Sequence, residues 1–128
     1  MLRLAMSSEA QRPGTLDRIL VACLCAEWCT ACRDYRAVFE QVRADHLDLH
    51  FLWVDIEDSA VLLDRIEVEN FPTILIGAGS TPCFFGPITP QREVLQRLIA
   101  VQRRHDMSRA DLGADIGALL RRLQSLAG

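Results

Sequence analysis

Lysine is absent from this chain of 128 residues, and all fourteen basic residues are arginine. The absence excludes enzymes that form a lysine Schiff base and nucleotide-binding loops whose lysine contacts phosphate. Long apolar runs are absent too, since none reaches the ~18–20 residues that cross a bilayer. An excess of positive charge is also missing, because the formal net charge is −3. We therefore expect no membrane span and no nucleic-acid partner, since phosphate binding needs clustered positive charge.

The number and spacing of the cysteines indicate the cellular compartment of the protein. The cysteines number five, and four of them crowd into residues 23–32. An odd, clustered set does not resemble the disulfide framework of a small secreted protein. Residues 1–8 carry one charge and too short an apolar stretch for a secretory signal. A cytoplasmic, reducing compartment is therefore expected, for a single soluble domain whose residues are 50% hydrophobic.

The segment Trp28–Cys32 (WCTAC) is the most informative motif. It follows a strand-like apolar run over residues 19–25 and precedes an amphipathic helical pattern. A thiol in the first turn of a helix meets unpaired backbone N–H groups and the positive end of the helix dipole, which favour thiolate. A second thiol three residues on can close a small disulfide ring. Cys29 and Cys32 are thus predicted to cycle between dithiol and disulfide.

Hydrophobic periodicity predicts alternating strands and helices, followed by a hairpin and further helices. This order indicates an α/β sandwich with a mixed sheet. Strands are expected over residues 2–6, 19–25, 49–55, 73–76 and 82–85, with helices over 30–44, 61–66 and 90–104 and a turn over 77–80.

The C-terminal segment has its own helical pattern of leucine and isoleucine between residues 107 and 126, which Ser108 could cap. We therefore divide the chain into a domain of residues 1–106 and a helical extension of residues 107–128. The connection between them is short, so the extension is expected to fold back on the domain or to form a homodimer contact.

Two signatures at a fixed separation make residues 16–104 resemble the thioredoxin family. Residues Ala26–Cys29 (AEWC) are similar to the family's active-site entry, and Asn70–Thr73 (NFPT) is similar to its second signature, in which a cis-proline precedes threonine. Gly86 matches the family's glycine near the active-site rim. The resemblance implies a thioredoxin-like fold, with a central mixed β-sheet flanked by helices, here followed by an extra C-terminal helix.

The resemblance also implies an activity. The protein would be a thiol–disulfide oxidoreductase, in which Cys29 attacks a protein disulfide and Cys32 resolves the mixed disulfide. No cofactor is expected, since the dithiol is the redox group, and an external reductant such as a thioredoxin reductase is implied.

A substrate-binding rim is implied by the same resemblance. Trp28 would be an apolar platform beside the sulfur, and Phe71 and Pro72 would form the opposing lip. A cis bond there would leave the local backbone free to pair with an extended substrate. Thr73 and Gly86 complete the expected rim.

Three positions depart from the family pattern. The two residues between the cysteines are Thr30-Ala31 instead of the usual Gly-Pro, so the reducing power is not fixed by the resemblance. The family's buried aspartate aligns with Cys23, and its partner lysine aligns with Trp53. A thiol is a poor substitute for a carboxylate that accepts a proton. Glu27 and Asp55 are nearby in sequence as alternative acid–base groups.

The same residues allow other interpretations. A zinc site is not expected, because the three histidines lack the spacing that would complete four ligands. Cys23 and Cys25 are expected as buried strand residues on one face, although Cys25 could be a redox accessory. Cys83 is expected to be structural or a surface thiol, and Trp53 a core residue. The alternative function, motivated by the missing Asp–Lys pair, is a chaperone-like binding or assembly module with little redox activity.

Overall fold

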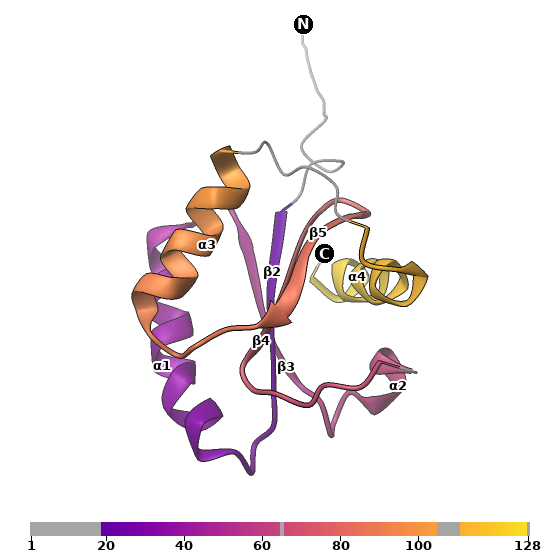
Figure 1. The fold of residues 1–128 in the computed structure, drawn as a ribbon, viewed down its shortest axis with the longest axis horizontal. Helices are drawn as coiled ribbons and strands as arrows, with labels where there is room; N and C mark the ends of the chain where they lie inside the picture. Colours follow the sequence, from indigo (N-terminus) through magenta and orange to yellow (C-terminus); the bar gives the residue numbers. More distant parts are fainter. Residues whose placement is uncertain (1–18, 65, 105–110, 128) are drawn as a thin grey trace, which may run out of the picture.

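The computed structural model describes residues 19–64, 66–104 and 111–127. Within them, a central sheet has helices on both sides (Figure 1). The strand expected over residues 2–6 lies outside the described residues. The elements in chain order are β2 (Ile19–Cys25), α1 (Thr30–Asp45), β3 (His50–Asp55), α2 (Ala60–Leu63), β4 (Thr73–Ala78), β5 (Thr81–Pro87), α3 (Arg92–Arg104) and α4 (Ala114–Ala127).

The four described strands form one mixed sheet in the order β3-β2-β4-β5. β2 pairs parallel with β3 and antiparallel with β4, and β4 pairs antiparallel with β5. Helix α1 connects β2 to β3, as a parallel pair requires a crossover. The mixed sheet and the α/β order expected from the sequence are therefore confirmed.

Several element boundaries differ from expectation, among them the ends of β4 and α2 and the start of α4. β4 continues through Gly77 and Ala78, two residues that the sequence pattern assigned to the turn, because Gly77 pairs with Pro82 across an irregularity in the ladder. The turn itself is Gly79-Ser80, and Gly79 has a φ of 60°, which glycine adopts at no steric cost. Helix α4 begins at Ala114, after Gly113 with a φ of 90°, rather than near residue 107. The predicted Ser108 cap lies outside the described residues.

Strand β2 is buried on both faces, and its side chains alternate between two apolar clusters. One face of β2 points toward α1 and α3. It carries Val21, Cys23 and Cys25, which pack with residues such as Phe39 and Ile99. The opposite face carries Leu20, Ala22 and Leu24, which pack against α4. The expectation that Cys23 and Cys25 share a buried face is confirmed.

Helix α4 covers the second face of the sheet, on the side opposite α1 and α3 (Figure 1). Its leucines Leu119, Leu120 and Leu123 are fully buried. Burial of each such side chain contributes roughly 1.5–3 kcal/mol. Of the two outcomes expected for the C-terminal segment, folding back on the domain is therefore what the structure contains. These leucines are not available for a dimer contact while α4 stays docked.

Helix α4 packs closely against the sheet at Gly77 of β4. A Cβ atom at this position would lie 2.7 Å from Cδ1 of Leu120, closer than side chains tolerate. The missing side chain of Gly77 thus sets the depth at which Leu120 packs.

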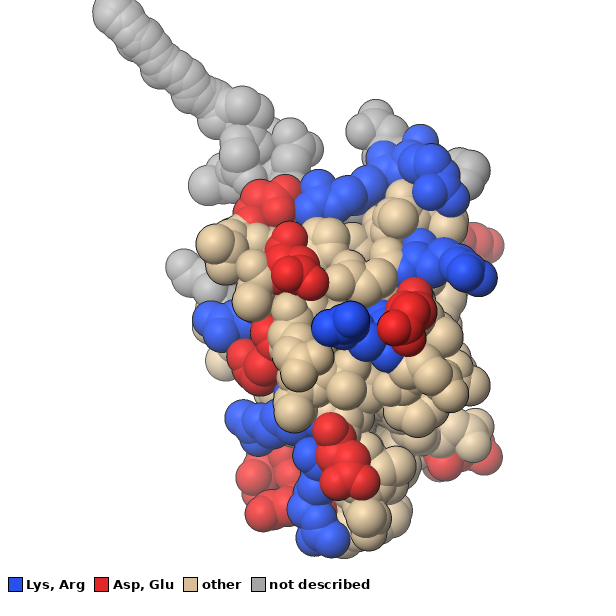
Figure 2. Space-filling model, turned by 90° about the vertical axis from the view of Figure 1, so that its left-hand side faces the viewer, with Lys and Arg blue, Asp and Glu red and all other residues tan. Residues whose placement is uncertain are grey.

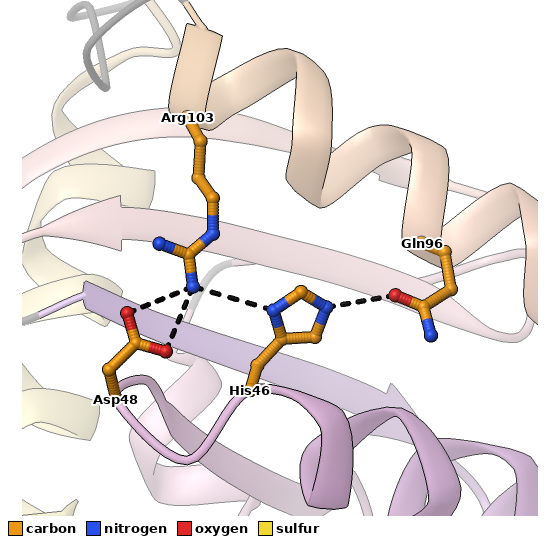
Figure 3. Close-up of polar contacts among 4 residues, drawn as sticks. All are labelled: His46, Asp48, Gln96 and Arg103. Carbon is orange, nitrogen blue, oxygen red and sulfur yellow. Dashed lines mark hydrogen bonds and ion pairs between the residues drawn. The ribbon is translucent and has the colours of Figure 1, made fainter.

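Polar contacts join the end of α1 to α3 on the other side (Figure 3). His46 Nε2 donates to Oε1 of Gln96 at 2.8 Å, and its Nδ1 accepts from Arg103 at 3.4 Å. Arg103 also donates to both carboxylate oxygens of Asp48, at 2.9 and 3.0 Å. The contact with Arg103 lowers the pKa of Asp48 below its ordinary value of 3.8.

Charge on this side of the molecule is mixed. Figure 2 views the molecule from the side of α1 and α3, where several basic side chains gather near the top of the view and basic and acidic side chains are interspersed over the rest.

Gly77→Ala is predicted to lower the free energy of unfolding by about 1–3 kcal/mol, because the new methyl group collides with Leu120. Urea unfolding measures the loss. The double variant with Leu120→Ala should lose less than the sum of the two single changes, since the collision is gone.

Gly117→Ala is the matched control for this change, because its Cβ would meet only Arg121 at an ordinary 3.7 Å. This substitution should raise stability by up to about 1 kcal/mol through helix propensity. Equal losses at both glycines would contradict the packing of Leu120 against Gly77.

Arg103→Gln is predicted to remove no more than about 1 kcal/mol at neutral pH, since water and salt screen the exposed Arg103–Asp48 pair. A carboxyl whose pKa is lowered on folding stabilises the protein above its unfolded pKa, and this contribution is lost as the pH falls through the folded value. The difference between the parent and Arg103→Gln should therefore shrink below pH 3.8. Thermal unfolding across pH tests this; a difference that grows toward acid pH would contradict it.

Candidate active site

The WCTAC motif spans the connection between the end of β2 and the first turn of α1. Cys29 is the N-cap of α1, with φ −84° and ψ 118°, and its amide donates to the carbonyl of Ala26 at 3.0 Å. The amide of Arg33 donates to the carbonyl of Cys29 at 3.2 Å, which closes the first helical turn. No side chain caps this helix end, and its first turn holds no acidic residue. The sulfur of Cys29 thus sits where backbone N–H groups and the helix dipole favour negative charge.

The cysteine pairing differs from the sequence-based expectation. Cys32 forms a disulfide with Cys25 of β2, with the two Cα atoms 5.7 Å apart. Cys29 is a free thiol and is partly exposed, whereas Cys25 and Cys32 are each 1% exposed. The burial expected for Cys25 is therefore confirmed, and the alternative that Cys25 is a redox accessory stays a prediction. The roles assigned to Cys29 and Cys32 stay predictions.

The sequence contained part of the signal for this pairing, namely the alternation of side chains along β2. Cys25 is the last residue of β2, and alternation turns its side chain toward the face that α1 covers. Cys32 lies on the buried side of the first turn of α1. A helix that returns over a strand brings these two positions together, a contact that sequence spacing along the helix does not reveal.

Cys23 lies next to this disulfide, and the three residues Cys23, Cys25 and Cys32 form a sulfur cluster. The sulfur of Cys23 is 3.8 Å from that of Cys25. Because a sulfur in a disulfide has no hydrogen, Cys23 is the donor in this contact. Burial raises the pKa of the Cys23 thiol far above its ordinary value, so the group stays protonated.

Tyr35 of α1 belongs to the same apolar cluster. Its hydroxyl is buried and has no hydrogen-bond partner among the described residues. Burial raises the pKa of Tyr35, and a negative charge on Cys23 would raise it further. The position of the family's buried aspartate thus holds a neutral thiol next to a neutral phenol.

Trp28 and Phe71 meet at the rim of the site. Their rings are in edge contact with centroids 5.6 Å apart, and the side chain of Trp28 is 61% exposed. The peptide bond between Phe71 and Pro72 is cis, as the second signature implied. The carbonyl of Pro72 accepts a hydrogen bond from the amide of Ile88 at 3.0 Å, so this carbonyl is not free to pair with a substrate.

The other two predicted rim residues have backbone and packing roles. Thr73 is 3% exposed, and its hydroxyl donates to the carbonyl of Asn70 at 2.6 Å, which holds the loop before β4. Gly86 is in β5 opposite Ile74, next to the pair of Thr73 and Pro87. Gly86 thus lies at the same end of the sheet as the cysteines, while Thr73 points inward.

A hollow of about 320 Å³ opens beside Cys32. Glu27 and Asp55, the two acid–base alternatives named from the sequence, both line it. One carboxylate oxygen of Asp55 accepts from the amides of Glu57 and Asp58, at 2.9 and 3.2 Å. The site therefore holds carboxylates beside the hollow that reaches Cys32, although Cys23 stands at the position of the family's buried aspartate.

Trp53, at the position of the family's lysine, is half-buried in the wall of this hollow. It packs against Phe39 with ring centroids 5.7 Å apart, and the guanidinium of Arg36 lies 5.2 Å from its ring centroid. Trp53 therefore packs against the core as expected, but it is not fully buried, because a surface arginine covers one side of its ring.

Metal-binding clusters and membrane-spanning helices are both absent among residues 19–64, 66–104 and 111–127. These residues contain no group of three or more histidine, cysteine or acidic side chains that could hold a metal ion. Their helices include none that is long and apolar enough to span a bilayer.

Comparison with known proteins agrees with this geometry. The family model described as thioredoxin matches residues 13–96. A thioredoxin H-type protein of Brassica oleracea is 29% identical over 63 residues, which are 49% of this chain and 51% of the relative. A protein of Streptomyces coelicolor described as putative thioredoxin 2 is 29% identical over 82 residues, 64% of this chain and 61% of the relative. The chain thus spans only about half to three fifths of these relatives.

Solved structures support the fold independently. A chain in the crystal structure of ferredoxin:thioredoxin reductase in complex with thioredoxin f2 superposes with a TM-score of 0.62 at 20% identity, covering 70% of this chain and 81% of that chain. The mixed four-stranded sheet, the cysteines at the start of α1, the cis-proline opposite them and the family match lead to one conclusion. The protein belongs to the thioredoxin family and has a thioredoxin-like α/β fold.

Proposed function

We propose that this protein is a cytoplasmic thiol–disulfide oxidoreductase that reduces protein disulfides, with Cys29 as the attacking thiol and Cys32 as the resolving thiol. The observation that carries the proposal is the difference in exposure between the two sulfurs. Cys29 is a partly exposed free thiol at the N-terminus of α1, and Cys32 is buried one turn further along the same helix. Exposure suits the group that meets the substrate, and burial suits the group that acts only within the protein.

The reaction starts from the reduced protein. Cys29 thiolate attacks one sulfur of the substrate disulfide, forming a Cys29–substrate bond while the other substrate sulfur leaves as a thiolate. Cys32 thiolate then attacks Cys29, and the bond to the substrate breaks. The substrate gains two electrons and two protons, and Cys29 and Cys32 become a disulfide. A reductant that supplies one dithiol or two thiols must then reduce the Cys29–Cys32 disulfide.

The rim formed by Trp28 and Phe71 supports a protein substrate. Trp28 offers an exposed apolar ring next to Cys29, and its edge contact with Phe71 holds it in place. An extended segment of the substrate could lie across this rim and pair with the backbone of Phe71. Because the carbonyl of Pro72 is already bonded to Ile88, the pairing would fall to Phe71 alone.

Glu27 or Asp55 is proposed to take the proton that Cys32 loses. Both line the hollow that reaches Cys32, whereas Cys23 is kept neutral by its surroundings. A carboxylate that is reached through a hollow replaces the family's buried aspartate in this scheme.

An external reductant, such as a thioredoxin reductase, is proposed to close the cycle. The solved complex of a reductase with thioredoxin f2 supports this type of partner, since that thioredoxin shares the fold. A cytoplasmic location remains part of the proposal, based on the odd and clustered set of cysteines.

Cys29→Ser is predicted to abolish reduction of insulin disulfides by dithiothreitol as catalysed by this protein, because the attacking sulfur is gone. Cys32→Ser should instead accumulate a mixed disulfide with insulin, since resolution fails. Turbidity of the released insulin chains measures the first outcome, and non-reducing gel electrophoresis measures the second.

Cys83→Ala is the control for these two variants, because Cys83 lies in β5 outside the sulfur cluster. It should retain the parent's activity. Full activity in both Cys29→Ser and Cys32→Ser would refute the redox assignment.

A second function, a binding or assembly module, is favoured by the exposed Trp28 alone. In that case a cysteine-free extended peptide would bind the double variant Cys29→Ser/Cys32→Ser as tightly as the parent, and Trp28→Ala would weaken binding in both. Fluorescence anisotropy of a labelled peptide measures this. Absence of binding to the double variant would eliminate the second function.

A further inference from the structure

We propose that Cys25 is a third redox-active thiol, which takes the disulfide over from Cys29 and sets Cys29 free while the protein remains oxidised. The inference deepens the proposed function and rests on it. The observation behind it is the disulfide between Cys25 and Cys32, which coexists with a free Cys29.

Cys32 is the sulfur that both arrangements share. It is bonded to Cys25 of β2, and Cys29 stands three residues before it at the start of the same helix. Residues three apart lie on the same side of a helix, so Cys29 is near enough to compete for Cys32. Cys32 thus has one partner on the strand and one on its own helix, and exchange between them needs no external thiol.

The exchange is balanced within the protein. After a substrate has been reduced, Cys25 thiolate attacks Cys32 in the Cys29–Cys32 disulfide. A Cys25–Cys32 bond forms, the Cys29–Cys32 bond breaks, and Cys29 leaves as a thiolate. No electron enters or leaves in this step, and the proton that Cys25 lost goes to Cys29 or to solvent. The reverse step begins when Cys29 thiolate attacks Cys32.

Cys23 serves this exchange as a hydrogen-bond donor. Its sulfur lies 3.8 Å from that of Cys25, and it is the donor whenever Cys25 is in a disulfide. The same S–H can therefore stabilise the negative charge that appears on Cys25 when Cys29 displaces it from Cys32. This gives the residue at the family's aspartate position a task that a thiol can perform.

The two disulfides differ in exposure. Cys25 and Cys32 are both buried, so their disulfide is sheltered from a bulky reductant. Cys29 is partly exposed in this form and keeps a reactive thiol. The Cys29 thiolate of the oxidised protein could then still attack a second disulfide, such as that of oxidised glutathione, forming a Cys29–glutathione bond while the other glutathione leaves as a thiolate. A protein holding a Cys29–Cys32 bond has no free thiol at Cys29 for this attack.

The sequence permits a direct test by peptide mapping. Cleavage after arginine and glutamate separates peptide 19–27, which holds Cys23 and Cys25, from peptide 28–33, which holds Cys29 and Cys32. The full chain is oxidised by insulin, free thiols are blocked with N-ethylmaleimide in acid, and the digest is analysed by mass spectrometry. A Cys25–Cys32 bond links the two peptides, whereas a Cys29–Cys32 bond leaves them separate.

For the parent protein we expect linked peptides, with fragmentation assigning the bond to Cys25 and Cys32. Cys25→Ala should give unlinked peptides with the bond between Cys29 and Cys32. Under native conditions, oxidised parent protein should react rapidly at Cys29 with N-ethylmaleimide, and oxidised Cys25→Ala should not. Cys83→Ala, as the matched control, should behave as the parent.

A redox equilibrium gives a second measurement that does not depend on insulin. If the linked form makes up about nine tenths of the oxidised parent, its loss in Cys25→Ala lowers the equilibrium constant for oxidation by glutathione about tenfold, or about 30 mV. An unchanged constant together with unlinked peptides in the parent would overturn the proposal.

Failure of this inference is distinguishable from failure of the proposed function. If the oxidised parent gives only unlinked peptides with a Cys29–Cys32 bond while Cys29→Ser has lost its insulin activity, the exchange does not occur and the proposed function stands. If the parent shows both bonds in glutathione buffers but Cys29→Ser reduces insulin as well as the parent, the exchange stands and the proposed function fails.

Discussion

The double burial of β2 is the constraint on which the rest of the structure depends. Every residue from Leu20 to Cys25 is buried, so both faces of the strand must be covered by helices. Side chains alternate along a strand, and one face therefore receives the cysteines while the other receives the leucines that α4 covers. A shift of one residue in the pairing of β2 with β4 would exchange the two sets. The face on which the sulfurs of Cys23 and Cys25 lie follows from this register.

The sequence was most informative where function and local geometry depend on the same residues. The WCTAC motif placed Cys29 at the start of a helix, and the NFPT segment predicted the cis bond before Pro72; both features are present. Strong apolar patterns located the strands to within a few residues. The helix start and the strands depend on neighbouring residues, which set the helix cap and the apolar pattern, whereas the cis bond was implied by the resemblance of the NFPT segment to the thioredoxin family.

Contacts between distant elements were the part that sequence reasoning could not supply. The disulfide of Cys25 depends on how α1 lies over β2, and spacing within the CxxC motif carries no information about that angle. The side chain of Thr73 was expected at the substrate rim, but its hydroxyl is turned inward to hold the carbonyl of Asn70. The docking of α4 was left open between two partners, because an apolar stripe fixes a buried face and not the surface that buries it.

The contact of α4 with the sheet also has a consequence for how the chain is made. The leucines of α4 that close the second core, up to Leu123, follow the other described helices and strands in the chain, so a ribosome delivers them after those elements. Until they emerge, the face of β2 with Leu20 and Leu24, and the neighbouring Leu75 of β4, is open to water and to other nascent chains. The face with the cysteines is already covered by then, because α1 and α3 precede α4. The two halves of the core are therefore completed in sequence, with the redox side assembled before the side that secures it.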